Sequence, residues 1–146
     1  MTPRSVAPYF LVLGLATFLV GGLFQAALDR SPLEYPDEPF QVDSPVRAPG
    51  PLHVVIPRCN TTDRDLHTTS VRILISLDSG ERWTLQTGSI NMAPGCEVVT
   101  ADLYLLPLEL PPGWYVLQTS AQTQGRIRVF TATHRSNAFE VIERKA

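Results

Sequence analysis

The side chains best suited to chemistry are few and widely spaced. Two cysteines, Cys59 and Cys96, lie 37 positions apart, and each is close to a turn signal. In an oxidising compartment an even pair of this kind predicts a disulfide. Free thiols are one alternative. A copper or zinc site is another, with further ligands from His53, His67, Met92 and His134. No Cys-x-x-Cys or His-x-x-x-His spacing supports that site, so we expect a disulfide and neither metal nor cofactor.

The sequence contains no motif typical of catalysis. Nucleophilic catalysis needs a base beside the nucleophile, and three scattered histidines without a G-x-S-x-G elbow do not provide one. We therefore expect no catalytic residue and no enzymatic activity. The formal net charge of −2 gives no indication of a nucleic-acid partner. The tripeptide Asn60-Thr61-Thr62 matches a glycosylation acceptor, which matters only in a eukaryotic secretory pathway.

The stretch from Ser76 to Trp83 reads Ser-x-Asp-x-Gly-x-x-Trp. This spacing resembles the Asp-box, a hairpin motif repeated in the propellers of sialidases and related glycan-cleaving enzymes. Those enzymes need several blades and a cluster of arginines, and a chain of 146 residues with one box has room for neither. We expect a structural hairpin instead. In it Asp78 bonds N–H groups of the turn, Gly80 supplies a positive φ and Trp83 packs in the core.

A charge-free run, residues 6–28, precedes all of these residues. A helix needs about 20 apolar residues to cross the hydrocarbon core. The alternative is a signal peptide cleaved near residue 23 or 27, but its apolar region is usually about 7–15 residues long. We interpret 6–28 as an uncleaved transmembrane helix after a short cytoplasmic head, residues 1–5. The flanking charges favour the remaining chain in the periplasm or outside the cell.

Small residues recur within this helix and predict packing against other membrane helices. One stripe contains Gly14, Thr17 and Gly21, and a second small-xxx-small pair contains Gly22 and Ala26. The alternative is that glycine is simply commoner in membrane helices.

Six prolines and no periodic apolar pattern characterise residues 29–51. This composition predicts an extended, semi-rigid linker before a domain at 52–146. Tyr35, Phe40 and Val42 are apolar positions that could dock onto a partner, and a solvated tether is the other interpretation.

From residue 52 the apolar residues alternate with period 2, which is typical of strands. We expect about seven strands, at 52–56, 71–78, 82–87, 98–106, 114–121, 126–131 and 137–143. This number of short strands predicts an all-β fold, an antiparallel β-sandwich.

The alternation also predicts which side chains face the core. In the strands at 114–121 and 137–143 these side chains are Tyr115, Leu117, Ala121, Phe139 and Val141. In two other strands the inward set would be Val71, Ile73, Ile75, Leu77, Ile127 and Val129.

The segment "LPPGWYVLQTSA" resembles a late strand of immunoglobulin-like and fibronectin type III domains. By this resemblance Tyr115 is the tyrosine of a tyrosine corner, and Trp83 is a core tryptophan. The hairpin of residues 71–85 is also similar to one in the dimerisation domain of sulfite oxidase-type enzymes, where a single Asp-box occurs without glycosidase activity. The resemblance covers residues 52–142 and implies a fold more than a function.

On the outward face we expect apolar side chains beside arginines, a combination enriched at protein interfaces. These residues are Leu74, Trp114, Val116, Phe130, Arg72, Arg126 and Arg128. Single exposed apolar residues are also normal, which is the alternative. The sequence as a whole predicts a membrane-anchored accessory subunit whose partners are the lipid bilayer and other membrane proteins. A receptor domain that binds a glycan or peptide is the second hypothesis.

Overall fold

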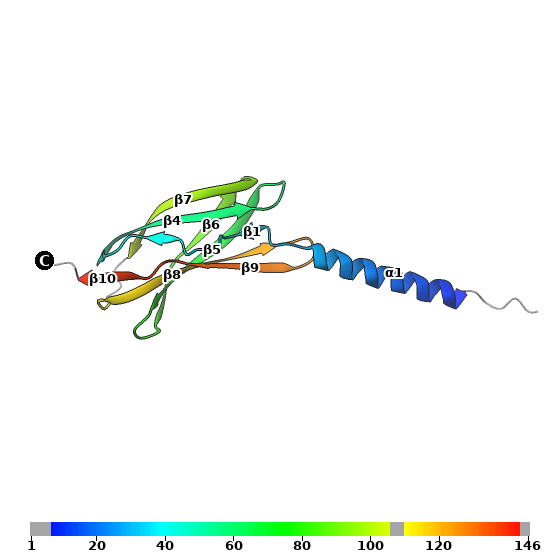
Figure 1. Ribbon diagram of the computed structural model, residues 1–146, viewed down its shortest axis with the longest axis horizontal. Coiled ribbons are helices and arrows are strands. Elements are labelled where there is room, and N and C mark those ends of the chain that lie inside the picture. The colour runs from blue at the N-terminus through cyan, green and yellow to red at the C-terminus, as the bar shows by residue number, and fades with distance from the viewer. Residues whose placement is uncertain (1–6, 106–109, 144–146) are drawn as a thin grey trace, which may run out of the picture.

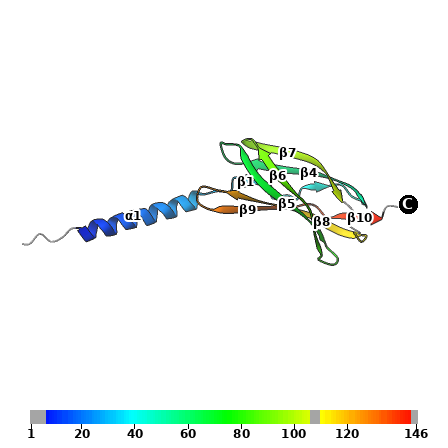
Figure 2. The same ribbon diagram turned by 180° about the vertical axis from the view of Figure 1, so that it is seen from behind.

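The computed structural model describes residues 7–105 and 110–143; the predicted head 1–5, Val6 and the end of the strand at Leu106 lie outside them. A long helix, α1 (Ala7–Leu28), extends from one end of an elongated β domain, and the last strand lies at the opposite end (Figures 1 and 2). Within α1, residues Tyr9–Leu28 are long and apolar enough to cross a membrane, and none of the 18-residue apolar stretch on which this rests is buried. A membrane span and a signal sequence both have these properties.

The first sheet is built around β4 (Gly50–Asn60). Along its whole length β4 pairs with β7 (Gly95–Leu105). Its other edge pairs with two short strands, β1 (Leu33–Glu34) and β2 (Gln41–Val42).

The second sheet has the order β3-β10-β8-β5-β6, with β9 paired to β8. Its strands are β3 (Val46–Ala48), β5 (Leu66–Ser76), β6 (Arg82–Met92), β8 (Gly113–Gln124), β9 (Val129–Arg135) and β10 (Phe139–Glu143). The β3–β10 pair is parallel and the other strand pairs of this sheet are antiparallel, so the sheet is mixed. The prediction of an all-β sandwich-like domain is confirmed, and its antiparallel character is confirmed only in part, because β3 and β10 pair in parallel.

The two sheets enclose a core whose residues follow the predicted alternation in β8 and β10. Tyr115, Leu117, Ala121, Phe139 and Val141 are all buried, as expected. All of them except Ala121 belong to one core cluster with Leu52, Val54 and Ile56 of β4. A smaller cluster of Leu33, Ile90, Met92 and Ala121 fills the end of the sandwich next to α1.

Residues 29–51 do not form the tether expected from their composition. Leu33, Phe40, Val42 and Val46 are buried in the core, and β1, β2 and β3 belong to the two sheets. Asn137 secures this segment, because its side-chain amide accepts a bond from the Val42 N–H and donates one to the Val42 carbonyl. The domain therefore begins directly after α1, and the expected boundary at residue 52 is wrong.

The predicted inward face of β5 is also wrong. Leu74, expected to face outward, is completely buried, whereas Leu77, expected to face inward, is 52% exposed. Val71, Ile73 and Ile75 are half-buried on the other face, where Ile75 pairs with Val116 of β8. The buried face of this central strand carries Leu74 between the polar residues Ser70, Arg72 and Ser76, so the apolar alternation indicated the opposite face. A change of phase by one residue exchanges the two faces completely.

Strand β9 differs from its prediction for a different reason. Ile127 and Val129, expected to face the core, are 51% and 58% exposed. The strand begins only at Val129, because residues 125–128 form the turn of the β8–β9 hairpin, closed by a bond from the Gly125 N–H to the Arg128 carbonyl. Within β9 the inward side chains are those of Phe130, Ala132 and His134.

Candidate functional site at the helix-proximal end

The most heavily bonded carboxylate of the described residues lies where α1 meets the sandwich. Asp29 follows the last residue of α1, and its carboxylate accepts three backbone N–H bonds from the β8–β9 turn. The donors are Arg126 at 2.8 Å, Ile127 at 3.0 Å and Arg128 at 3.1 Å. The Arg128 guanidinium also donates to the Asp29 carbonyl. One side chain thus fixes the end of the helix to a hairpin about a hundred residues away in sequence.

The charge of Asp29 suits this role. Burial alone would raise the pKa of its carboxyl, but the three backbone donors and the nearby Arg128 charge lower it further than burial raises it. The net pKa therefore lies below the ordinary value of 3.8. The ionised form is the one that binds the turn.

Gly125 leaves the space that this carboxylate occupies. A Cβ built on Gly125 would lie 2.6 Å from the Phe130 ring and 2.8 Å from an Asp29 carboxylate oxygen. Any larger residue here would push one of these groups away. Asp29 was not among the predicted site residues, and the available signal was a carboxylate directly after an apolar helix.

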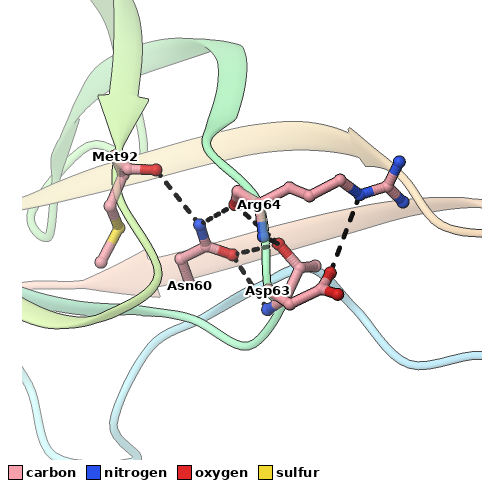
Figure 3. A network of polar contacts seen from close by, with 5 residues as sticks. Asn60, Asp63, Arg64 and Met92 are labelled. Carbon is pink, nitrogen blue, oxygen red and sulfur yellow. Dashed lines mark hydrogen bonds and ion pairs between the residues drawn. The ribbon is translucent and has the colours of Figure 1, made fainter.

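The β4–β5 loop closes the same end of the sandwich around Asn60 (Figure 3). The Asn60 amide donates to the carbonyls of Arg64 and Met92, and its oxygen accepts from the N–H and hydroxyl of Thr62. The side chain is buried and all its polar atoms are used. Asn60 therefore has a structural role in the folded domain, where its amide is inaccessible to glycosylation.

A recess lies between this loop, the start of the segment after α1 and the β8–β9 turn. It has a volume of about 440 Å³. Its lining residues are Leu28, Asp29, Arg30, Pro32, Thr61–Arg64 and Gln124–Arg126. Three exposed arginines, Arg30, Arg64 and Arg126, border it, and Arg64 forms an exposed ion pair with Asp63 at 3.8 Å.

The residues predicted as one interface do not share a face. Leu74 is in the core, and Arg72 is half-buried, where burial and then the Arg58 charge lower its pKa despite an opposing effect from Tyr35. Val116 is half-buried. The others separate to the two ends of the sandwich, Trp114 at one and Arg126, Arg128 and Phe130 at the other. The twelve residues of β8 place these ends about 35–40 Å apart.

The Asp-box hairpin lies at the end far from α1. Ser76 Oγ accepts the Ser79 N–H, and Gly80 has a φ of 74°, as expected for the turn. Asp78, however, accepts the Trp114 N–H at 3.1 Å and so bridges to the start of β8 rather than closing its own turn. Trp83 is half-buried against the core, with its ring centroid 5.9 Å from that of Tyr115.

Two other predictions from the sequence are present in the fold. A disulfide joins Cys59 and Cys96, which are directly opposite in β4 and β7. The Tyr115 hydroxyl donates to the Pro111 carbonyl at 2.6 Å, the bond that defines a tyrosine corner.

The remaining candidates have no partner that would give them a role here. Gly14, Gly21 and Gly22 have no neighbouring atom within 4 Å of an added Cβ, and the Thr17 hydroxyl donates to the Leu13 carbonyl of its own helix. Ala26 is half-buried. Helix packing through these five residues stays a prediction. In the part of the chain that the structure describes, no three His, Cys, Asp or Glu side chains gather as a metal site would require.

No protein-family model matches the sequence, and no curated protein matches it. Solved structures do resemble the fold. The C-terminal domain of wzt aligns with a TM-score of 0.50 and 14% identity, over 81% of this chain and 77% of that one. A β-glucosidase from Erythrobacter marinus has the same TM-score and identity, over 75% of this chain but only 15% of the enzyme. At this identity the similarity supports the β-sandwich fold and carries no information on activity.

Proposed function

We propose that this protein is a single-pass membrane-anchored interaction module, a non-catalytic accessory or assembly subunit of a larger membrane complex. The observation that carries the proposal is the junction at Asp29. An exposed apolar helix of 22 residues is about 33 Å long, which matches the hydrocarbon core. It continues into a folded domain with no free linker, because the Asp29 carboxylate bonds the first residues after the helix to the β8–β9 turn.

The same proposal assigns the β domain to the extracytoplasmic side, with the amino terminus in the cytoplasm. The disulfide between Cys59 and Cys96 supports this orientation, because disulfides persist in the periplasm and outside the cell.

The domain itself is best classified as immunoglobulin-like. Its segment before β4 contributes to both sheets, since β1 and β2 pair with β4 whereas β3 pairs in parallel with the final strand β10. The tyrosine corner of Tyr115 is a further immunoglobulin-like feature. Such domains commonly serve as binding and assembly modules, and this analogy supports an interaction role only at the level of the fold.

A surface for a protein partner is available at the end far from α1. Trp114 and Leu77 are 48% and 52% exposed, and a backbone bond from the Leu77 N–H to the Trp114 carbonyl holds them side by side. Tryptophan is among the residues most enriched at the energetic centres of protein contacts, and the exposed leucine beside it enlarges the apolar area. The Asp78 bond to the Trp114 N–H keeps this pair in position.

Membrane fractionation with intact-mass measurement tests the anchor. The expected result is a full-length chain that stays in carbonate-washed membranes. A soluble mature chain that begins near residue 23 or 27 would overturn the proposal.

Photo-crosslinking from a membrane preparation tests the interaction surface. A photoreactive residue at Trp114 should produce a discrete crosslinked product. The control position is Val98, which is 65% exposed, more than Trp114 at 48%, but lies on β7. Equal crosslinking at both positions, or none at Trp114, would contradict a specific contact at this end.

A further inference from the structure

We propose that the β8–β9 turn is a second membrane contact, in which Ile127 enters the interfacial layer and the neighbouring arginines bind anionic phospholipid headgroups. This inference rests on the proposed membrane anchor. It adds a site, the helix-proximal end of the sandwich, and a ligand, the phosphate-bearing headgroup of a bilayer lipid.

The position of the β8–β9 turn, next to α1, supports this proposal. Asp29 holds the turn directly beside the end of α1, and both views show the tip of this hairpin meeting the helix (Figures 1 and 2). A small recess is lined jointly by Phe24, Gln25 and Leu28 of α1 and by Arg126 and Ile127 of the turn. Phe24 precedes Leu28 by about 6 Å along the helix axis. If α1 spans the bilayer, Ile127 lies at the depth of its last turn.

The composition of the turn tip also supports a membrane contact. Turn tips usually carry small polar residues, yet Ile127 and Val129 are both more than half exposed here. Arg126 and Arg128 flank Ile127, so apolar and cationic side chains alternate along the tip. Segments that lie in the membrane interface combine the same two kinds of side chain, with apolar groups toward the acyl chains and cations toward the phosphates.

The charge of the helix-proximal end suits an anionic ligand. The recess at this end is bordered by Arg30, Arg64 and Arg126. The Asp29 carboxylate is directed at three backbone N–H groups, and Asp63 is the other acid of the lining. Arginines therefore outnumber acids on the surface that faces the headgroups, even with Arg64 paired to Asp63, and Lys or Arg near an anionic leaflet is attracted to it.

The proposal is tested by measuring how deeply single fluorescent labels lie in the bilayer of nanodiscs. Both native cysteines are in the disulfide, so an environment-sensitive fluorophore can be attached to Ile127→Cys, Phe18→Cys or Leu77→Cys variants of the full chain. Leu77 is the matched control, since it is as exposed as Ile127 but lies at the far end. We expect blue-shifted emission and quenching by spin-labelled lipids at positions 18 and 127, and aqueous emission at position 77.

The outcomes separate this inference from the proposed function. An aqueous label at position 18 would show that the anchor itself is wrong. A lipid-exposed label at 18 with an aqueous label at 127 would leave the anchor intact and overturn the second contact. Equal lipid exposure at 127 and 77 would also overturn it, because the whole domain would then lie on the membrane.

Lipid selectivity tests the headgroup site separately. In nanodiscs of mixed phosphatidylcholine and phosphatidylglycerol, native mass spectrometry should detect several-fold enrichment of phosphatidylglycerol on the full chain. The paired Arg30→Gln and Arg126→Gln substitutions should abolish the enrichment, and Arg82→Gln, an exposed arginine at the far end, should not. Equal loss with Arg82→Gln, no enrichment in the native chain, or displacement by inorganic phosphate would each overturn a lipid site.

Discussion

At the scale of single residues, Asp29 contributes more to the stability of the domain than its place beside an apolar helix indicated. We expect Asp29→Asn to lower the melting temperature of the domain at neutral pH. The amide keeps one acceptor oxygen but presents an NH₂ group to N–H donors of the turn. Thermal unfolding in detergent measures the effect. Asp37→Asn, at an exposed position, is the matched control and should leave the melting temperature unchanged.

The same carboxylate predicts a pH dependence with a definite sign. The pKa of Asp29 in the folded protein is lowered, so its contribution to stability is fully present above about pH 3.8 and is lost as the pH falls through the folded pKa. The melting-temperature difference between the native chain and Asp29→Asn should therefore be constant near neutrality and shrink in acid. A difference that grows below pH 3.8 would contradict the clamp.

We expect substitutions in the Asp-box to destabilise the domain less than they would if the hairpin were fully buried. Trp83 is half-buried, so Trp83→Ala should cost about 2 kcal/mol of unfolding free energy, less than the 3–5 kcal/mol typical of a fully buried tryptophan. Asp78→Ala removes one exposed bond to the Trp114 N–H and should cost about 0.5–1.5 kcal/mol. Denaturant titration measures both, and a reversed order of the two effects would show that the hairpin depends mainly on Asp78.

At the scale of the elements, the disulfide stabilises a pairing that already extends over both strands. Cys59 and Cys96 are one of eleven opposite pairs between β4 and β7. The chain-entropy model assigns about 3.5–4 kcal/mol to a crosslink across 37 positions. Cys96→Ser should lower the unfolding free energy by about this amount while the native β fold persists. The native chain after reduction is the control, and it should unfold like the variant; a reduced chain with unchanged stability would contradict the prediction.

At the scale of the whole molecule, the domain depends for its stability on residues 29–51, whose composition resembles that of a linker. A fragment of residues 29–146 should unfold cooperatively, whereas a fragment of residues 52–146 should not. The shorter fragment lacks four buried side chains, Leu33, Phe40, Val42 and Val46. At about 1.5–3 kcal/mol each, these contribute roughly as much as the total stability of a typical domain, about 5–15 kcal/mol.

Circular dichroism melts of both fragments, purified with the disulfide formed, check this prediction. The 29–146 fragment serves as the matched control, because both fragments lack α1 and differ only in the disputed segment. A sharp melting transition for residues 52–146 would restore the boundary that the composition suggested.

Several features depended only on local sequence and were predictable from it. The apolar run determines a helix of bilayer length, because a helix satisfies its own backbone bonds without a partner. The alternation in β8 and β10 indicated their buried faces, because most of the polar side chains, Gln118, Ser120, Gln122 and Glu140, lie on the opposite faces. Gly80 and its neighbours determined the hairpin, since turn conformation is a short-range property.

Other features were decided by contacts between distant residues. Nothing in residues 29–51 indicates that Phe40 and Val42 are buried in the core, because a short strand paired at two positions leaves no period to detect. The phase of β5 depended on which face the opposing sheet covers. The Asp29 clamp joins groups about a hundred positions apart, so only the folded chain brings the carboxylate to the turn that gives it a function.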